Sequence, residues 1–313
     1  MNLTIRIKVL KRFLSKKTHL ESAKLSSSYD ICKTITKSNA KNFYYCFQVL
    51  PKNLKRSIYA LYAFCRYCDD IADSNLSKSK KFNSLNTVKD NLNTSENLKF
   101  IYPALFDSIK KFSIPKKYFH MLLNGMEMDI EMKKNIAHYK TFNDLKKYCY
   151  NVSSVVGLMC IEVFGYNSSK ATHYAIQLGY AMQITNITRD IFEDLDTGRI
   201  YIPKEDFSTC EYTLAELKKY KLNDNYKNLV KLQISRARKL FIESQNLLPL
   251  IPNKSRFCIA AIIEIYSRIL DLIEKYDYDL INNHIRLSTK EKIIFMIKYY
   301  FSYSFSQIFK SNS

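Results

Sequence analysis

The sequence predicts an all-α protein built as a single helical bundle, and three observations support this fold class. Glycine and proline are scarce, with 5 and 6 among 313 residues, and no strand-and-turn pattern recurs. Long segments with apolar residues at helical spacing dominate the chain. No linker rich in Gly, Ser or Pro divides it, and the hydrophobic share of 47% is ample for one core.

The chain is strongly basic, with 49 Lys and Arg against 29 Asp and Glu and a net charge of +20. The basic residues are spread out and do not gather beside a recognition motif, so we expect no nucleic-acid partner. A basic surface instead favours anionic membranes and diphosphate substrates. Eight cysteines at irregular spacings in apolar runs indicate free thiols in a reducing cytoplasm.

The two ends of the chain are predicted to lie outside the main domain, which we place at residues 26–300. Residues 1–25 form a basic extension, for which a transit-like peptide, a membrane-touching helix and a frayed tail all stay open. Residues 301–313 form a C-terminal tail. No apolar run reaches the roughly 18–20 residues of a transmembrane helix, so any membrane contact is expected to be peripheral, at the inner face.

The first predicted helices carry aromatic and acidic side chains. Residues 29–50 are predicted to form a helix pair, or one helix with a break near Ser38-Asn39. Phe43 and Phe47 are four residues apart, so both rings project the same way, either into the core or into a hydrophobic tunnel. Pro51 ends this segment, and Asn53 opens the next helix.

That next helix, Ser57–Asp73, ends in carboxylates. Asp69 and Asp73 share a face, whereas Asp70 lies off it. Arg66 precedes them by one turn, close enough to hold a phosphate or to pair with an acid. The polar stretch that follows, over residues 74–97, is predicted to be a loop.

Two further predicted helices contain small residues that permit close packing. Residues 116–134 contain Gly125, which costs roughly 1 kcal/mol against Ala in a helix and therefore indicates a close approach or a kink. Residues 141–166 form a buried helix in which Ser153, Ser154 and Gly157 leave room beside Tyr148.

The motif at residues 183–203, QITNITRDIFEDLDTGRIYIP, is the strongest functional signal. Asn186, Asp190 and Asp194 are spaced four residues apart and fall on one helix face. A solvated acidic face is the ordinary interpretation of such a pattern. A second acidic helix face at residues 69–73 changes this, because two such faces meeting across a cavity predict a site for Mg²⁺ and a phosphorylated substrate.

Three more helices are predicted towards the C-terminus. Residues 226–248 and 256–282 are amphipathic. Residues 289–310 alternate lysines with an aromatic-rich face, which suits either a core helix or an interfacial membrane helix.

From Tyr29 to Lys298 the sequence resembles the squalene/phytoene synthases, enzymes that join two prenyl diphosphates head to head. Four motifs in the family's order carry this resemblance: LYAFCRYCDDIAD, GMEMD, YCYNVSSVVGLM and the 183–203 motif. The resemblance implies an all-α terpenoid-synthase bundle around a central apolar cavity. Ser153-Ser154-Val155 departs mildly from the usual pattern, which affects the shape of the cavity.

The resemblance also implies roles for individual residues. The Mg²⁺ ligands would be Asp69, Asp73, Asp190 and Asp194, with Asn186 as an added contact to metal or diphosphate. Diphosphate oxygens would be held by Lys41, Arg66 and Arg189, and the residues near the reacting carbons would be Gln183 and Tyr148. The first product would be a cyclopropylcarbinyl diphosphate, with NADPH required only if the reaction proceeds to squalene.

The substrate is the least decided point. Residues 42–51 and 161–166 look more like bacterial squalene-pathway enzymes, and Phe47 stands where phytoene synthases tend to have a smaller residue, so we favour two farnesyl chains over two geranylgeranyl chains. A non-catalytic relative acting as an assembly factor would be expected to lose aspartates that this chain keeps. A head-to-tail synthase would repeat D-D-x-x-D where this chain has NITRDIFED. The oligomeric state stays open.

Overall fold

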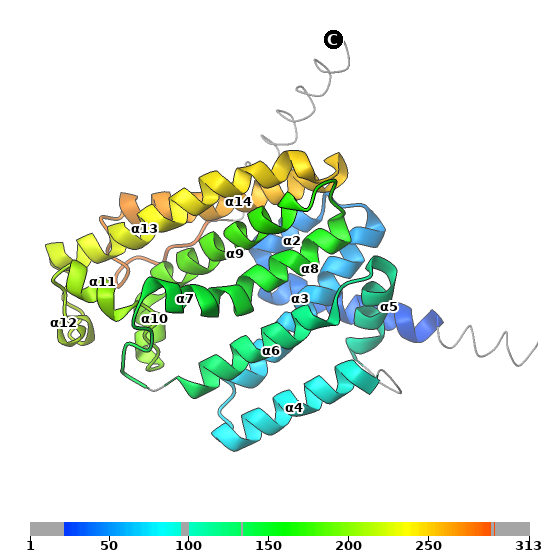
Figure 1. The fold of residues 1–313 in the computed structure, drawn as a ribbon, viewed down its shortest axis with the longest axis horizontal. Helices are drawn as coiled ribbons and strands as arrows, with labels where there is room; N and C mark the ends of the chain where they lie inside the picture. Colours follow the sequence, from blue (N-terminus) through cyan, green and yellow to red (C-terminus); the bar gives the residue numbers. More distant parts are fainter. Residues whose placement is uncertain (1–21, 95–99, 133, 289–290, 292–313) are drawn as a thin grey trace, which may run out of the picture.

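The computed structural model describes residues 22–94, 100–132, 134–288 and 291. All regular structure in these residues is helical, which confirms the predicted all-α class. The long helices run alongside one another, with α13 and α14 along one side, α4 along the other, and α3, α6, α8 and α9 between them (Figure 1). After a helix over residues 22–39, the elements are α2 (Lys41–Phe47), α3 (Lys52–Asp73), α4 (Lys78–Thr94), α5 (Tyr102–Phe112), α6 (Lys116–Glu131), α7 (Phe142–Cys149), the π-helix η1 (Tyr150–Ser154), α8 (Val155–Phe164), α9 (Lys170–Arg189), α10 (Ile191–Asp196), α11 (Lys204–Thr209), α12 (Leu214–Lys218), α13 (Asp224–Ser244), the 3₁₀-helix η2 (Gln245–Leu250) and α14 (Asn253–Lys275).

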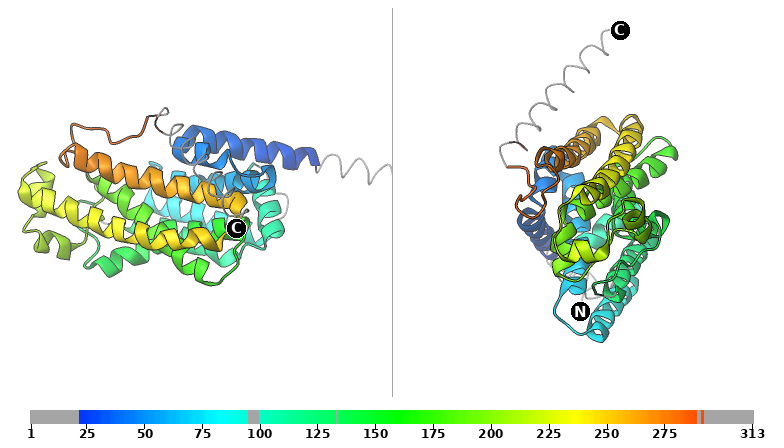
Figure 2. Two further views of the ribbon diagram at one scale, coloured as in Figure 1. Left: turned by 90° about the horizontal axis from the view of Figure 1, so that it is seen from above. Right: turned by 90° about the vertical axis from the view of Figure 1, so that its left-hand side faces the viewer.

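The core is formed around α9, which packs against η1, α8, α13 and α14. From above, α14 lies between α13 and the N-terminal helices (Figure 2), and α14 contacts α2 directly. The predicted break near Ser38-Asn39 is confirmed, because the first helix ends at residue 39 and α2 begins at Lys41. Pro51 precedes α3 as its N-cap residue, as expected for a residue that ends one helix and admits the next.

The loop predicted for residues 74–97 is wrong. Most of this stretch is α4, which packs on α6. Its sequence is polar, but Leu85, Val88 and Leu92 are fully buried at spacings of three and four residues. Such a narrow apolar stripe is enough for a helix that covers one face of a neighbour.

Two glycines allow α6 and α9 to approach the π-helix closely. A Cβ atom on Gly125 would lie 2.6 Å from Val152 Cγ1, so the predicted close approach is confirmed. At Gly179 of α9 the contact is tighter, because a Cβ atom would lie 2.4 Å from Ser154 Cα. The predicted helix over residues 141–166 is therefore interrupted by η1 at the level where both neighbours touch it.

The acidic motif does not lie on one continuous helix. α9 ends at Arg189, and Asp190 (φ −99°, ψ 16°) separates it from the short α10. The helical spacing of Asn186, Asp190 and Asp194 is retained across this kink, because the N–H of Asp190 donates to Asn186 O (2.9 Å) and the N–H of Asp194 donates to Asp190 O (2.8 Å).

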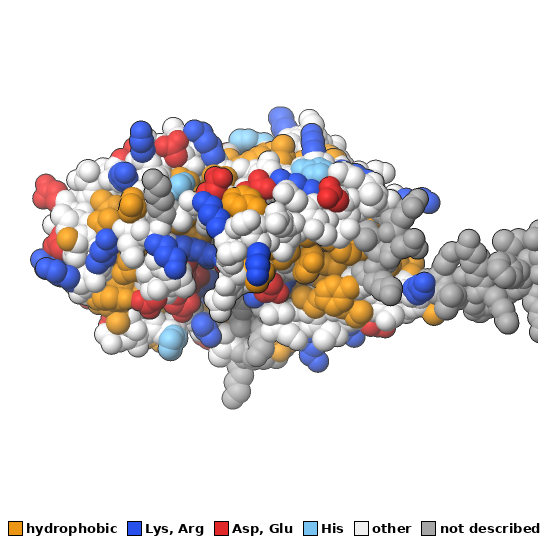
Figure 3. Space-filling view, turned by 90° about the horizontal axis from the view of Figure 1, so that it is seen from below, with side chains coloured by type: hydrophobic (Ala, Val, Ile, Leu, Met, Phe, Trp, Pro, Cys, Tyr) orange, Lys and Arg blue, Asp and Glu red, His pale blue; other side chains and the backbone are white. Residues whose placement is uncertain are grey.

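The described helices are all too short or too polar to cross a bilayer. The predictions for the basic N-terminal residues and for the aromatic helix over 289–310 fall almost entirely outside the described residues. On the face seen from below, Lys and Arg side chains are scattered among acidic and apolar ones and do not form one stripe (Figure 3).

Candidate functional site

Two cavities meet inside the bundle. A polar cavity of about 780 Å³ is lined by α2, α3, α9, α14 and the segment that follows α14. An apolar cavity of about 250 Å³ lies between α2, α3, η1, α8, α9 and α14. Both are lined by Phe43, Tyr62, Asn186 and Tyr266. A ligand with a charged head and a hydrocarbon tail therefore fits across the junction.

The apolar cavity runs lengthwise along α3 and α9. Its lining on α3 begins at Asp69 and reaches back to Ile58, and on α9 it runs from Asn186 to Ala175. Eleven residues of helix at 1.5 Å each give a length of about 16 Å. The polar groups Asp69, Gln183 and Asn186 belong to one end of this tunnel, and aliphatic side chains line the other.

Arg199 connects two groups of aspartates at the polar end, because its backbone N–H donates to Asp194 O (2.8 Å) and its side chain pairs with Asp73. Arg199, in the segment after α10, pairs with Asp73 at the end of α3 (Nη2–Oδ1 2.7 Å). On the other side Arg189 holds Asp190 through two hydrogen bonds of 2.6 and 2.5 Å.

A third carboxylate, Asp129 of α6, lies close enough to Asp73 and Asp194 to interact with both electrostatically. It accepts hydrogen bonds from Tyr148 (3.1 Å) and Tyr201 (2.9 Å), whose rings stack with centroids 5.1 Å apart. Tyr148 is placed by α7, which starts with a capping box: Thr141 accepts from the N–H of Asp144, which in turn accepts from Thr141. Burial of Asp129 raises its pKa to about 6, against the opposing charge of Arg199.

The surroundings of two aspartates of the site disfavour the ionised form of their side chains. Burial, followed by the charge of Asp73, raises the pKa of Asp69 to about 7. Burial, followed by the charge of Asp190, raises the pKa of Asp194 to about 8. Neither carboxylate forms a hydrogen bond or an ion pair within the described part of the chain. Additional positive charge at this place would therefore stabilise both ionised side chains.

The aspartates do not form a preassembled metal cage. Within the described ranges, no three Asp, Glu, His or Cys side chains converge closely enough to hold one ion. Mg²⁺ usually takes one or two carboxylates together with water and substrate phosphates. An arrangement of separate carboxylates around a polar cavity is compatible with that mode of binding.

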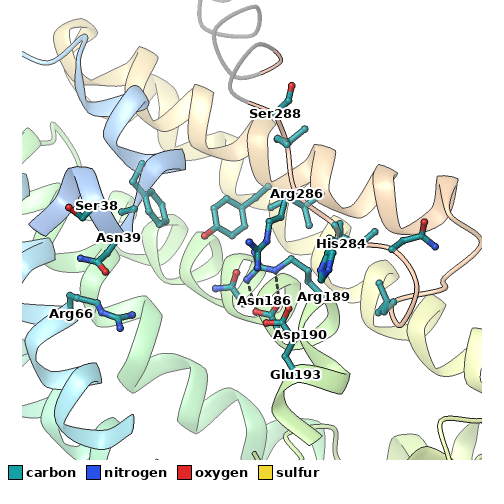
Figure 4. Close-up of a pocket in the computed structure, with 18 of the residues that line it drawn as sticks. Ser38, Asn39, Arg66, Asn186, Arg189, Asp190, Glu193, His284, Arg286 and Ser288 are labelled. Carbon is teal, nitrogen blue, oxygen red and sulfur yellow. Dashed lines mark hydrogen bonds and ion pairs between the residues drawn. The ribbon is translucent and has the colours of Figure 1, made fainter. Parts of the chain in front are cut away.

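Basic side chains line the polar cavity from three directions. Arg66 extends from α3, Arg189 from α9, and Arg286 from the segment after α14, which also contributes His284 (Figure 4). Arg66 pairs with Asp70 (2.5 Å), the aspartate that lies off the shared face, so Asp69 keeps its carboxylate free for other partners.

The sequence matches the profile described as "Squalene/phytoene synthase" over residues 36–291. The chain belongs to the squalene/phytoene synthase family. Members of this family are prenyltransferases that condense prenyl diphosphates head to head, so the protein belongs to an enzyme family of that class.

Curated relatives of this synthase include the phytoene synthase of Arthrospira platensis, 31% identical over 285 residues, covering 86% of this chain and 91% of the relative. The 15-cis-phytoene synthase of Synechococcus elongatus is 30% identical over 286 residues, covering 87% of this chain and 92% of the relative. Among solved structures, a dehydrosqualene synthase superposes with a TM-score of 0.82 at 30% identity, covering 91% of this chain and 99% of that one. A squalene synthase from Alicyclobacillus acidocaldarius superposes with a TM-score of 0.75 at 25% identity, covering 82% of this chain and 96% of that one. The terpenoid-synthase-like fold is confirmed.

The structure brings most of the predicted site residues of this synthase to the two cavities. The polar one is lined by Phe43, Arg66, Asn186, Arg189 and Asp190, and the apolar one by Phe43, Phe47, Asp69, Gln183 and Asn186. Asp73 and Asp194 line neither cavity. Asp73 is held beside the polar end by its ion pair with Arg199, and Asp194 follows Asp190 by one helical turn. Tyr148 lines neither and is turned to Asp129. Lys41 starts α2, and its side chain lies outside the described part.

Sequence reasoning assigned no role to four residues that the structure places at the candidate site: Asp129, Arg199, Tyr201 and Tyr266. Asp129 follows Gly125 by one turn in the GMEMD motif, and a paired glycine and aspartate was the only available signal. Arg199 and Tyr201 stand near the end of the 183–203 motif, and their side chains reach Asp73 and Asp129 on other helices. Tyr266 lies in an ordinary amphipathic helix, and nothing in its sequence context marks it.

Proposed function

We propose that this enzyme condenses two farnesyl diphosphates in a Mg²⁺-dependent head-to-head reaction, giving a cyclopropylcarbinyl diphosphate. The observation that carries the proposal is the apolar tunnel whose one polar end lies between two groups of aspartates. A prenyl chain would occupy the tunnel, and its diphosphate would lie in the polar cavity beside Asn186 and Asp190, with Asp69 at the polar end of the tunnel.

The length of the tunnel supports the shorter substrate. With C–C bonds of about 1.5 Å, which advance about 1.25 Å each along an extended chain, the twelve-carbon main chain of farnesyl spans about 14 Å and the sixteen-carbon chain of geranylgeranyl about 19 Å. The lining along α3 is about 16 Å long. The rings of Phe43 and Phe47, with centroids 6.0 Å apart, further narrow the tunnel on the side formed by α2.

The carboxylates suit Mg²⁺ in their chemistry. Asp69, Asp73, Asp190 and Asp194, with Asn186, offer hard oxygen donors, and the partnerless carboxylates of Asp69 and Asp194 would gain from a cation. Bound Mg²⁺ would supply positive charge to the departing diphosphate without a proton donor.

The arginines supply fixed positive charge to the same diphosphate oxygens. Arg66 and Arg189 line the cavity, and their guanidinium groups match phosphate oxygens in bidentate geometry. Each is paired with one aspartate, Asp70 or Asp190, which keeps the guanidinium oriented toward the cavity before substrate arrives.

The tyrosines donate hydrogen bonds in this arrangement and do not act as bases. Burial and the charge of Asp129 raise the pKa of Tyr148 well above its usual value, so the phenol stays neutral at physiological pH. We assign Tyr148 and Tyr201 the task of orienting Asp129, which in turn lies close to Asp73 and Arg199.

The proposed bond changes use the polar cavity for the diphosphate and the apolar tunnel for the hydrocarbon chain. The C1–O bond of one farnesyl diphosphate breaks, and its electron pair leaves with the diphosphate. C2 of the C2=C3 double bond of the second chain then bonds to this C1, which leaves the positive charge on C3. Loss of a proton from the same C1 of the first chain closes the cyclopropane ring between C1 and C3, and the second chain keeps its own CH2–diphosphate group. The tunnel keeps water away from the cation, and the faces of Phe43 and Tyr266 are placed to stabilise positive charge.

A phytoene synthase acting on two geranylgeranyl diphosphates is the second candidate. It is favoured by the names of the curated relatives at 30–31% identity. The discriminating experiment incubates the purified protein with Mg²⁺ and each diphosphate separately and identifies the products by mass spectrometry. A C30 product supports the first proposal and a C40 product alone supports the second.

We also propose a peripheral position at the inner face of the membrane, because the products are oils that need an apolar acceptor. Conversion to squalene would need NADPH as reductant. A non-catalytic role as an assembly factor is disfavoured by the retained aspartates.

A further inference from the structure

A second basic pocket lies far from the aspartates. It has a volume of about 370 Å³ and is formed where the helix over residues 22–39, the start of α3 and the end of α5 meet. Figure 1 shows this N-terminal helix and α5 at the end of the molecule opposite α10–α12. α3 itself spans 22 residues, which is about 33 Å, so the pocket and Asp73 lie at its two ends.

The pocket contains an arginine that is held in place without an acidic partner. The guanidinium carbon of Arg56 lies 4.0 Å from the ring centroid of Tyr29. Tyr29 is buried and donates its hydroxyl hydrogen to Asp107 Oδ2 (2.6 Å), which fixes the ring. Among the described residues Arg56 has no ion pair and no hydrogen bond, so its N–H groups remain available for an anion.

Two lysines complete the pocket. Lys52, one turn before Arg56 on α3, and Lys111, at the end of α5, also line it, and neither forms an ion pair in the described part of the chain. Asp107 is the one acidic side chain in the lining, and it accepts from Tyr29. Three cations against one carboxylate, with a planar guanidinium among them, make a site for a phosphate group.

The place of this pocket relative to the tunnel suggests which phosphate it meets. The tunnel lining on α3 ends at Ile58, two residues after Arg56, so the hydrocarbon end of the tunnel and the basic pocket share one end of the molecule. The chain before residue 22 carries six further basic residues, Arg6, Lys8, Lys11, Arg12, Lys16 and Lys17, and joins the same helix that supplies Tyr29.

We propose that the pocket formed by Tyr29, Lys52, Arg56 and Lys111 binds the headgroup phosphate of an anionic phospholipid and docks this end of the enzyme on the membrane. Only the purpose of this docking, the delivery of an oily product to the membrane, rests on the proposed function. The aspartates then face away from the bilayer, toward water-soluble Mg²⁺ and inorganic diphosphate.

The test measures co-sedimentation of the full chain with vesicles of phosphatidylcholine and phosphatidylglycerol in equal parts, without substrate or metal. Removing two cations near an anionic surface weakens binding at least about tenfold, so we expect this loss in Arg56→Gln/Lys111→Gln. The control Lys218→Gln/Lys219→Gln removes the same charge from exposed positions at the C-terminal end of α12, at the other end of the molecule, and we expect it to bind within about twofold of wild type.

Equal binding by the two double variants would overturn the proposal and assign any membrane affinity to diffuse charge. Calorimetry with inorganic phosphate tests whether the pocket binds free phosphate instead of a lipid headgroup. If the pocket variant loses phosphate binding but keeps vesicle binding, the site serves free phosphate and the proposal fails. Thermal unfolding verifies that the pocket variant is folded. Because condensation in detergent is measured separately, failure of the catalytic proposal would leave the vesicle result unchanged.

Discussion

Replacing Gly179 by alanine tests whether the close approach of α9 to the π-helix positions the site. The added Cβ would meet backbone atoms of Ser154 at 2.4 and 2.6 Å. Backbone cannot rotate away as a side chain can, so α9 and η1 must move apart. Gln183 and Asn186 follow on α9 by one and two turns, and the movement would displace both from the junction of the cavities.

The sign of the stability change is diagnostic. In a helix without tertiary contacts, glycine to alanine stabilises by about 1 kcal/mol. Overpacking of a filled site costs about 1–3 kcal/mol, and a backbone contact belongs at the upper end of that range. We therefore expect a net loss of about 2 kcal/mol in the free energy of unfolding for Gly179→Ala.

Urea denaturation followed by circular dichroism measures this difference, and steady-state assays measure kcat. Gly125→Ala is the matched variant, because its closest contact is the side chain of Val152 at 2.6 Å. Combining it with Val152→Ala should recover part of the lost stability, whereas no side-chain truncation should rescue Gly179→Ala. A Gly179→Ala protein that is more stable than wild type, with unchanged kcat, would refute the reasoning.

Three further predictions follow from the site. Asp69→Asn should nearly abolish turnover while the helical circular dichroism spectrum stays unchanged, and EDTA should stop the wild type reversibly; activity that survives both would exclude the metal mechanism. Phe47→Ala should cost about 3–5 kcal/mol of stability and raise the ratio of kcat/KM for geranylgeranyl over farnesyl diphosphate; an unchanged ratio would make Phe47 a packing residue only. The pKa values of Asp69 and Asp194 are raised to about 7 and about 8, so the folded state holds these protons more tightly than the unfolded state and the metal-free protein should lose stability as the pH rises from about 4 to about 8. A Tm that does not fall over this range, or falls as steeply in an Asp69→Asn/Asp194→Asn variant, would contradict it.

The bundle and most of the cavity lining could be predicted from the sequence, because helical periodicity and the spacing of acids carry that information locally. The break at Ser38-Asn39, the close approach at Gly125 and the position of Asp69 all follow from nearest-neighbour rules. α4 could not be predicted in the same way. Its three buried aliphatic residues are scattered in a polar context, and only packing on α6 makes the helix stable.

The residues that sequence reasoning missed are set by tertiary contacts. Asp129 becomes part of the site through Tyr148 and Tyr201, which are 19 and 72 residues away in the chain. Arg199 reaches Asp73 across 126 residues. The kink at Asp190 also has no local cause in composition, since neither glycine nor proline stands there.

The most direct test of the central claim is the product formed by the purified enzyme with Mg²⁺ and farnesyl diphosphate as the sole substrate. The account predicts a C30 cyclopropylcarbinyl diphosphate, formed faster than any C40 product from geranylgeranyl diphosphate under the same conditions. Formation of a C40 product with no turnover of farnesyl diphosphate would contradict the chain-length assignment. The absence of any head-to-head product from either substrate would contradict the catalytic proposal itself.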